Sequence, residues 1–255
     1  GLDVTVLIKE TRAVIGPRAR VEAGGDVVVL ADGSEDIVSV AASLGVTGGS
    51  VGVGGSISVQ VLDTTAFAAI EGGVGIGAIV HAGGAVDVSA TGDFTAKLVA
   101  GGIAFGPDAG VGVSNTTLVH KDKVLASIGQ GAEVTAGGDA GVRVAAWSTE
   151  DLITIAAAGG GGSSAGIGAS AVVNVLEETT RAFIDNGAHV TAQAAGAATG
   201  GILVDAQDDT TAIVVAGAIG AGSTAGIGAG VSVNTFTKRT EAVIGSGVTA
   251  FTDGD

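Results

Sequence analysis

The sequence predicts an all-β protein, a β-solenoid of the parallel β-helix kind, from three observations. Three short phrases recur at one spacing along the whole chain. Within each repeat, β-branched residues alternate with mostly polar ones, so one face of a strand is buried and the other is wet. Glycine supplies 47 of the 255 residues and aromatic residues only 3%, which suits closely stacked coils built from small side chains.

The repeat is defined by a strand that ends in Ala-x-Ile, by a glycine-rich phrase and by a Gly-Gly corner. Each phrase recurs roughly every 57 residues. The Ala-x-Ile strands end at Ile15, Ile70, Ile128, Ile184 and Ile244. The glycine-rich phrases lie at 51–54, 109–112, 165–168 and 225–228, and the corners at 21–25, 80–84 and 134–138.

The repeats predict one array over residues 1–255 rather than several domains. We expect repeats at approximately 1–58, 59–116, 117–173 and 174–233, with a partial repeat at 234–255. The chain starts at Gly1 with neither a methionine nor a signal peptide, so we expect it to be a fragment of a longer protein.

Strands are favoured over helices in every repeat. Segments such as 86–90, 142–144 and 202–206 alternate with period two and are rich in Val and Ile. Each interior glycine costs a helix about 1 kcal/mol relative to alanine. We favour about three coils of roughly 19 residues in each repeat. One wide layer per repeat, with longer strands, is the alternative that the sequence leaves open.

Composition excludes several classes of protein. There is no cysteine, so neither disulfides nor cysteine-based metal sites can form. Asp and Glu outnumber Lys and Arg by 26 to 11, which argues against a nucleic-acid partner. A hydrophobic content of 46% argues against intrinsic disorder.

Charged residues precede each Ala-x-Ile phrase, and together they include both signs. Mixed signs in one column predict a solvated corner between strands. The members of this mixed column are Lys9, Glu10, Arg12, Asp63, Lys121, Asp122, Lys123, Glu177, Glu178, Arg181, Lys238, Arg239 and Glu241.

A second column is acidic throughout. Stacked carboxylates repel one another unless water, salt or a cation separates them, and calcium favours clustered oxygen ligands. We interpret the column first as solvated turns and second as a cation site for calcium; no other cofactor is expected. Its members are Asp32, Glu35, Asp36, Asp93, Glu150, Asp151, Asp208 and Asp209.

A third column places amides among apolar residues. Gln60, Asn174 and Asn234 each follow their glycine phrase by the same interval, and Leu118 breaks the column in one repeat. Stacked amides can hydrogen-bond along a solenoid axis, so we predict a structural amide ladder.

Neither catalysis nor membrane insertion has strong support in the sequence. The glycine-rich loops lack a following Lys-Ser/Thr, and the three histidines fall in different columns, so we predict no catalytic residue. Residues 153–176 and 212–233 are long apolar stretches, but their glycines and polar residues argue against a membrane span.

The ordered phrases resemble the repeats of large bacterial filamentous adhesins of the leukotoxin-like and filamentous haemagglutinin-like kind. The phrases that carry the resemblance lie at 132–139, 165–170, 172–174, 180–184 and 187–192. The resemblance implies a secreted β-helical shaft at the bacterial cell surface. The Asn-Pro motifs of that family's secretion domain are missing, since neither Pro17 nor Pro107 follows Asn.

The sequence therefore favours a structural shaft or adhesive segment of a giant extracellular protein or filament, without catalysis. The expected partners are flanking repeats or other copies end to end, and a host or surface receptor or glycan. Two alternatives stay open: a carbohydrate-active lyase or hydrolase on a parallel β-helix, and a membrane-inserting toxin segment.

Overall fold

The computed structural model describes residues 1–73, 77–138, 140–193 and 201–252, and their regular structure is entirely strand. The strands form three parallel sheets. Sheet A contains β1 (Leu2–Ile15), β4 (Val51–Ile70), β7 (Ala109–Ile128), β10 (Ala165–Ile184) and β13 (Ala225–Ile244). Sheet B contains β2 (Arg20–Ala23), β5 (Ile79–Ala82), β8 (Glu133–Ala136), β11 (His189–Ala192) and β14 (Thr249–Thr252). Sheet C contains β3 (Val27–Val46), β6 (Val86–Gly106), β9 (Val142–Gly162) and β12 (Ile202–Ala221).

The predicted fold class, an all-β parallel solenoid, is confirmed, but the favoured coil size is wrong. Ile15 pairs with Ile70, and Ile70 pairs with Ile128, so one repeat makes one layer and not three coils. Most of the long strands run for 20 residues because the period-two alternation continues without a break. The wide layer, which the sequence left as the alternative, is the arrangement in the structure.

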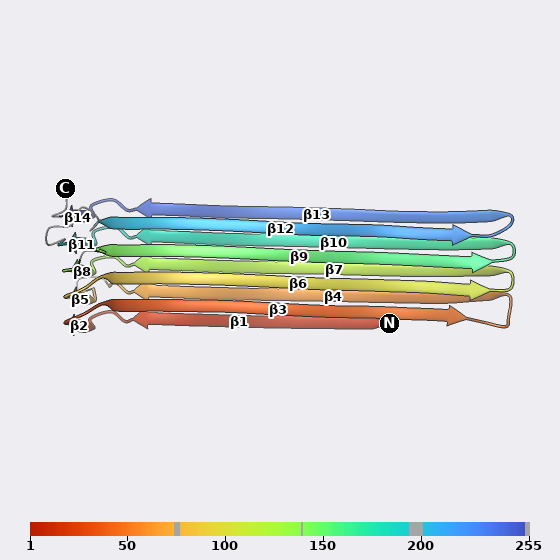
Figure 1. Cartoon of the computed structure of the whole chain (residues 1–255), viewed down its shortest axis with the longest axis horizontal. Coiled ribbons are helices and arrows are strands. Elements are labelled where there is room, and N and C mark those ends of the chain that lie inside the picture. Colours follow the sequence, from red (N-terminus) through yellow and green to blue (C-terminus); the bar gives the residue numbers. More distant parts are fainter. Residues whose placement is uncertain (74–76, 139, 194–200, 253–255) are drawn as a thin grey trace.

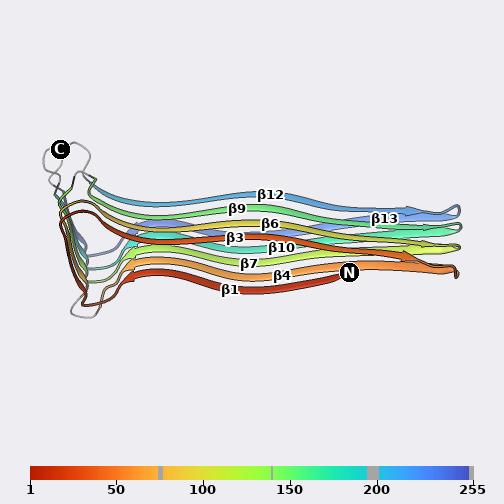
Figure 2. The ribbon, with the colours of Figure 1, turned by 60° about the horizontal axis from the view of Figure 1, so that its bottom comes forward.

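Each layer runs out along sheet C, turns, and returns along sheet A (Figure 1). The short strands of sheet B cross one end of the molecule, which we call the closed end (Figure 2). The opposite end, where β3 joins β4 and β6 joins β7 through short turns, is the tapered end. The three sheets draw their strands from the whole chain, as a single array requires.

The inward side chains become smaller from the closed end to the tapered end. On β7 the inward positions pass from Ile128 through Leu118 and Ser114 to Gly112. A Cβ atom added to Gly112 would lie 2.1 Å from the carbonyl oxygen of Gly159 and 2.7 Å from that of Gly102. The two long sheets therefore approach until only glycine fits between them. Many of the glycines therefore lie inside long strands and not in turns.

Two apolar clusters fill the wider part of the interior. The cluster at the closed end is built from Val, Ala and Ile of all three sheets, including Val88, Val134 and Ile128. The second contains Leu62, Leu98, Leu118, Leu152 and Leu176 together with Phe94 and Ala96, between sheets A and C. Charged and polar side chains occupy the interior between these clusters, and they form the site described below.

Replacing Arg18 with glycine is expected to stabilise the protein slightly. Arg18 has φ of 65°, and the corresponding turns of later layers place Gly131, Gly187 and Gly247 in the same left-handed conformation. Relief of the side-chain strain, about 1 kcal/mol, outweighs the extra freedom of glycine in the unfolded chain by a few tenths of a kcal/mol. Urea unfolding would measure the gain; Arg20→Gly, in strand β2, should destabilise instead.

Candidate functional site

Successive residues of a strand point to opposite faces, so part of the mixed column faces the interior. Lys9, Thr64, Asp122, Glu178 and Lys238 are in register across sheet A, and all lie on its inner face. Glu35, Glu150 and Asp208 lie on the facing inner side of sheet C. We call the charged members the ionic layer: Lys9, Glu35, Asp122, Glu150, Glu178, Asp208 and Lys238.

In the N-terminal repeats of the solenoid, Lys9 and the hydroxyls of Thr64 and Ser148 contact the acids of the ionic layer. Lys9 Nζ lies 2.6 Å from Glu35 Oε1. Thr64 Oγ1 donates to Asp122 Oδ1 at 2.6 Å, and Ser148 Oγ donates to Asp122 Oδ2 at 3.1 Å. Ser148 also contacts Glu150. Both oxygens of Asp122 are thus hydrogen-bonded although no lysine reaches them among the described contacts.

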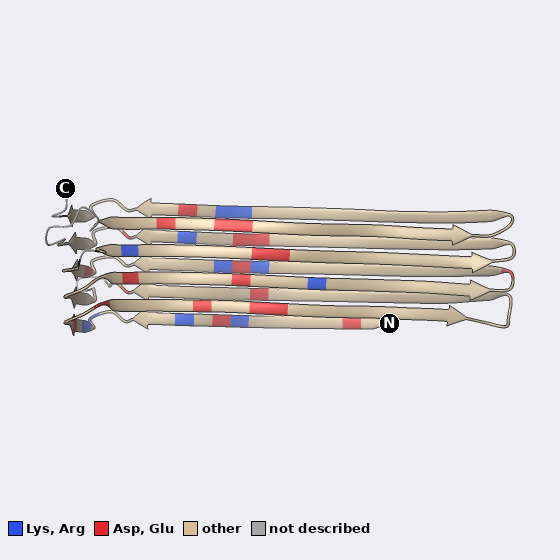
Figure 3. Cartoon of the chain, viewed as in Figure 1, with Lys and Arg blue, Asp and Glu red and all other residues tan. Residues whose placement is uncertain are grey.

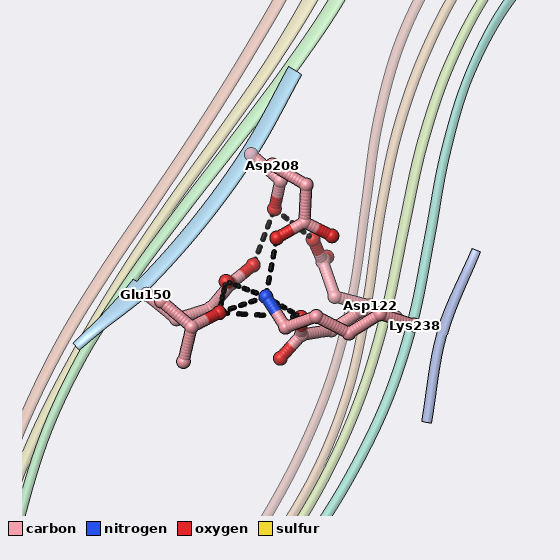
Figure 4. A network of polar contacts seen from close by, with 7 residues as sticks. Asp122, Glu150, Asp208 and Lys238 are labelled. Carbon is pink, nitrogen blue, oxygen red and sulfur yellow. Dashed lines mark hydrogen bonds and ion pairs between the residues drawn. The ribbon is translucent and has the colours of Figure 1, made fainter. Parts of the chain in front are cut away.

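At the last layers, Lys238 lies between three carboxylates (Figure 4). Its Nζ is 2.6 Å from Glu178 Oε2 and 3.3 Å from Glu150 Oε2, and it also contacts Asp208. Thr210 Oγ1 donates to Glu150 Oε2 at 2.6 Å. One ammonium group therefore contacts three neighbouring acids, and its single positive charge balances one carboxylate.

Burial raises the pKa of two of these acids. It raises the pKa of Asp122 to about 6, although the hydrogen bonds from Thr64 and Ser148 oppose the shift. It raises the pKa of Glu178 to about 7, against the opposing effect of Lys238. Burial would lower the pKa of Lys238, but its contacts with Asp208 and Glu178 outweigh that and raise it. Asp122 and Glu178 therefore exchange protons near neutral pH.

His120 lies beside the ionic layer as a neutral, buried ring. Its Nε2 is 3.0 Å from Thr64 Oγ1, whose own proton goes to Asp122, so Nε2 carries the proton that it donates to Thr64. The ring packs on Phe94 with centroids 3.8 Å apart. Burial lowers the pKa of His120 to about 4. This histidine is thus part of the packing and holds no charge at neutral pH.

The prediction that the mixed column is a solvated corner is wrong: all its members lie within long strands, and four of them face the interior. Lys9, Asp122, Glu178 and Lys238 face the interior, in the middle of long strands. The sequence contained a signal that was missed: steps of two back from the buried Ile128 reach Asp122, and steps of two back from Ile184 reach Glu178. The remaining members lie on the outer face of sheet A: Glu10, Arg12, Asp63, Lys121, Lys123, Glu177, Arg181, Arg239 and Glu241.

The predicted acidic column is divided between the two faces of sheet C. Neighbours such as Glu150 and Asp151 point in opposite directions because successive strand residues alternate. Glu35, Glu150 and Asp208 face inward. Asp32, Asp36, Asp93, Asp151 and Asp209 face outward. The structure therefore does not bring the eight predicted residues together.

One group of acids has the spacing of metal ligands. Glu150, Glu178 and Asp208 each offer an oxygen, and these oxygens lie within 4.8 Å of one another. Glu178 belongs to the mixed column and was not among the predicted cation ligands. The Lys238 ammonium already lies among the three carboxylates, so the protein supplies its own cation at this place. Calcium binding stays a prediction.

The amides of the predicted ladder share one inner column of sheet A. Asn174 Nδ2 donates to Asn234 Oδ1 at 2.8 Å across one layer step. Leu118 separates Asn174 from Gln60, and Gln60 instead donates to Asp3 Oδ2 at 2.7 Å. Only one step of a ladder is therefore present among these three residues.

The described residues include no helix with the length and apolar character that crossing a membrane requires. Each of the stretches 153–176 and 212–233 instead contains the end of a strand of sheet C, a turn, and the beginning of the next strand, in sheet A. Comparisons with protein-family models, with curated proteins and with solved structures find no match to the chain.

Proposed function

We propose that this chain is a shaft segment of a large extracellular bacterial protein, a structural element without catalysis. One observation carries the proposal: every layer repeats the same path, in register, from the first strand to the last. A solenoid of this kind grows by adding layers, each of which contacts only its neighbours. A rigid element of adjustable length is what a shaft needs.

The two ends of the stack support the same proposal. Strands β1 and β13 are the outermost strands of sheet A, and β3 and β12 those of sheet C. An open strand edge presents backbone N–H and C=O groups that pair readily with another strand. Flanking repeats or further copies would complete both ends. The ionic layer supports a structural function too, because its carboxylates are buried and hydrogen-bonded rather than open to a substrate.

Immunogold labelling of the producing bacterium tests the location and the extended form. Antibodies against the chain should label intact cells, at a distance from the outer surface that grows with the number of layers. Labelling that requires permeabilised cells would contradict the proposal. Incubation with a panel of polysaccharides tests the enzyme alternative, since a lyase or hydrolase would release new chain ends and a shaft would not.

Removing one whole layer is expected to shorten the solenoid without destroying it. Deletion of 129–184 joins Ile128 to Asp185, so that Ile128 takes the place of Ile184, its register partner in the next layer. The melting temperature should fall, because one interface between layers is lost, while the far-ultraviolet spectrum stays that of a β protein. Duplication of the same residues should raise the melting temperature. Complete unfolding of the deletion variant would show that the layers do not act as modules.

A further inference from the structure

Near the tapered end, the outer face of sheet A is apolar and exposed. This apolar face consists of the outward side chains of 2–8, 51–61, 109–119, 165–175 and 225–235. Val53 is 69% exposed and Ile227 is 56% exposed, although valine and isoleucine are residue types that proteins usually bury. None of its outward side chains is charged, since Asp3 points inward to Ser39 and Gln60.

The apolar face ends at a sharp border. Asp63, Lys121 and Glu177 are in register and face outward, and the charges of sheet A continue from there toward the closed end (Figure 3). The few polar side chains within the face include Asn115 and Thr117, which are hydrogen-bonded to each other at 3.0 Å. Little polar surface would therefore be left unpaired if another surface covered this face.

The size of the face matches that of a stable protein interface. The five strands are about 4.8 Å apart and rise about 3.3 Å per residue, and with seven residues of β1 and eleven of each other strand they cover roughly 800 Å². Contiguous apolar patches on monomers are usually about 300–600 Å². A stable interface buries about 800 Å² on each partner. The whole face is thus as large as one side of a specific dimer.

We propose that the apolar face binds the same face of a second copy of this chain. The two sheets would pack face to face about 10 Å apart, as in a β-sandwich. A two-fold axis across the strands, near the row of Val113 and Ala169, covers one apolar face with the other. The charged halves then project from the pair in opposite directions and stay in water. This pairing concerns the side of the solenoid, so it goes beyond the shaft proposal.

Lipid, another occupant, fits less well. In this chain by itself, lipid would leave the open edges of β1 and β13 without hydrogen-bond partners in hydrocarbon. The outer face of sheet C is also apolar near the tapered end, but Lys97 interrupts it. It also has a hollow of about 470 Å³ bordered by Ile103, Phe105 and Ile219. Sheet A offers the flatter and uncharged surface for a copy.

Single cysteines test the geometry directly, because the chain contains none of its own. Ala169→Cys places a thiol near the two-fold axis, so mild oxidation should link two copies. Thr179→Cys lies on the same strand and the same face, about 33 Å from that axis at about 3.3 Å per residue, and should cross-link at least about tenfold more slowly. Equal rates for the two variants would overturn the proposal.

Sedimentation equilibrium tests the energy of pairing. The unaltered chain should form dimers at micromolar concentration. Val113→Glu should raise the dimer dissociation constant at least about tenfold, whereas Leu125→Glu, outward on the same strand but in the charged half, should not. Melting curves check that both variants fold. A monomeric chain, a dimer that survives Val113→Glu, or monomers that float with phosphatidylcholine vesicles would each overturn the proposal.

Discussion

Replacing Gly112 with valine is expected to cost about 3 kcal/mol of the free energy of unfolding, or more. The reason is backbone contact: a Cβ at this position would lie 2.1 Å from the carbonyl oxygen of Gly159. Sheets A and C cannot separate locally without breaking neighbouring layers, since β7 is the central strand of its sheet. Urea unfolding followed by circular dichroism would measure the loss.

Gly101 provides the matched control for this substitution. It lies on the outer face of β6, where an added Cβ meets nothing within 4 Å. Gly101→Val should leave stability unchanged or raise it slightly, because valine suits an extended strand better than glycine. Equal losses for Gly112→Val and Gly101→Val would show that β propensity, and not the approach of the two sheets, determines where glycine is needed.

The protein is expected to be more stable at pH 5 than at pH 8, by about 2 kcal/mol. The pKa of Asp122 is raised to about 6 and that of Glu178 to about 7, so the folded state holds protons that the unfolded state has released. Their contribution is present at low pH and is lost as the pH rises through these values. His120 opposes them between its folded pKa of about 4 and the ordinary 6.5. Urea unfolding at the two pH values would measure the difference.

Removing both acids should reverse the sign of this pH dependence. In the double variant Asp122→Asn, Glu178→Gln, His120 remains as the buried group with a strongly shifted pKa, and its contribution grows with rising pH. The variant should therefore be more stable at pH 8 than at pH 5. An unchanged slope would show that the ionic layer does not control the pH dependence.

The sequence predicted the fold class because its period-two alternation and its repeats are local and regular. It did not fix the coil size, because a period of roughly 57 residues fits several short coils as well as one wide layer. The glycines at inward positions such as Gly54 and Gly112 resemble corner residues in a sequence, yet they lie within extended strands. Only the approach of sheet C to sheet A distinguishes these two functions of glycine.

The charged residues show the same division. Their recurrence in every repeat is visible in the sequence, but their exposure depends on which face each strand turns to the interior. Asp122 and Lys121 are neighbours in the chain, but Asp122 is buried whereas Lys121 lies on the outer surface. A column of charges was therefore predicted, and its division into an ionic layer and an outer surface was not.

By itself, the sequence determined that this protein is a repetitive array of strands with small side chains and with more acidic than basic residues. The tertiary structure decided how far each strand runs before it turns, which acids Lys238 meets, and that a large apolar face lies outside the core. The physical reason is that alternation assigns residues to two faces of a strand. Which face becomes the interior depends on the second sheet that packs against it.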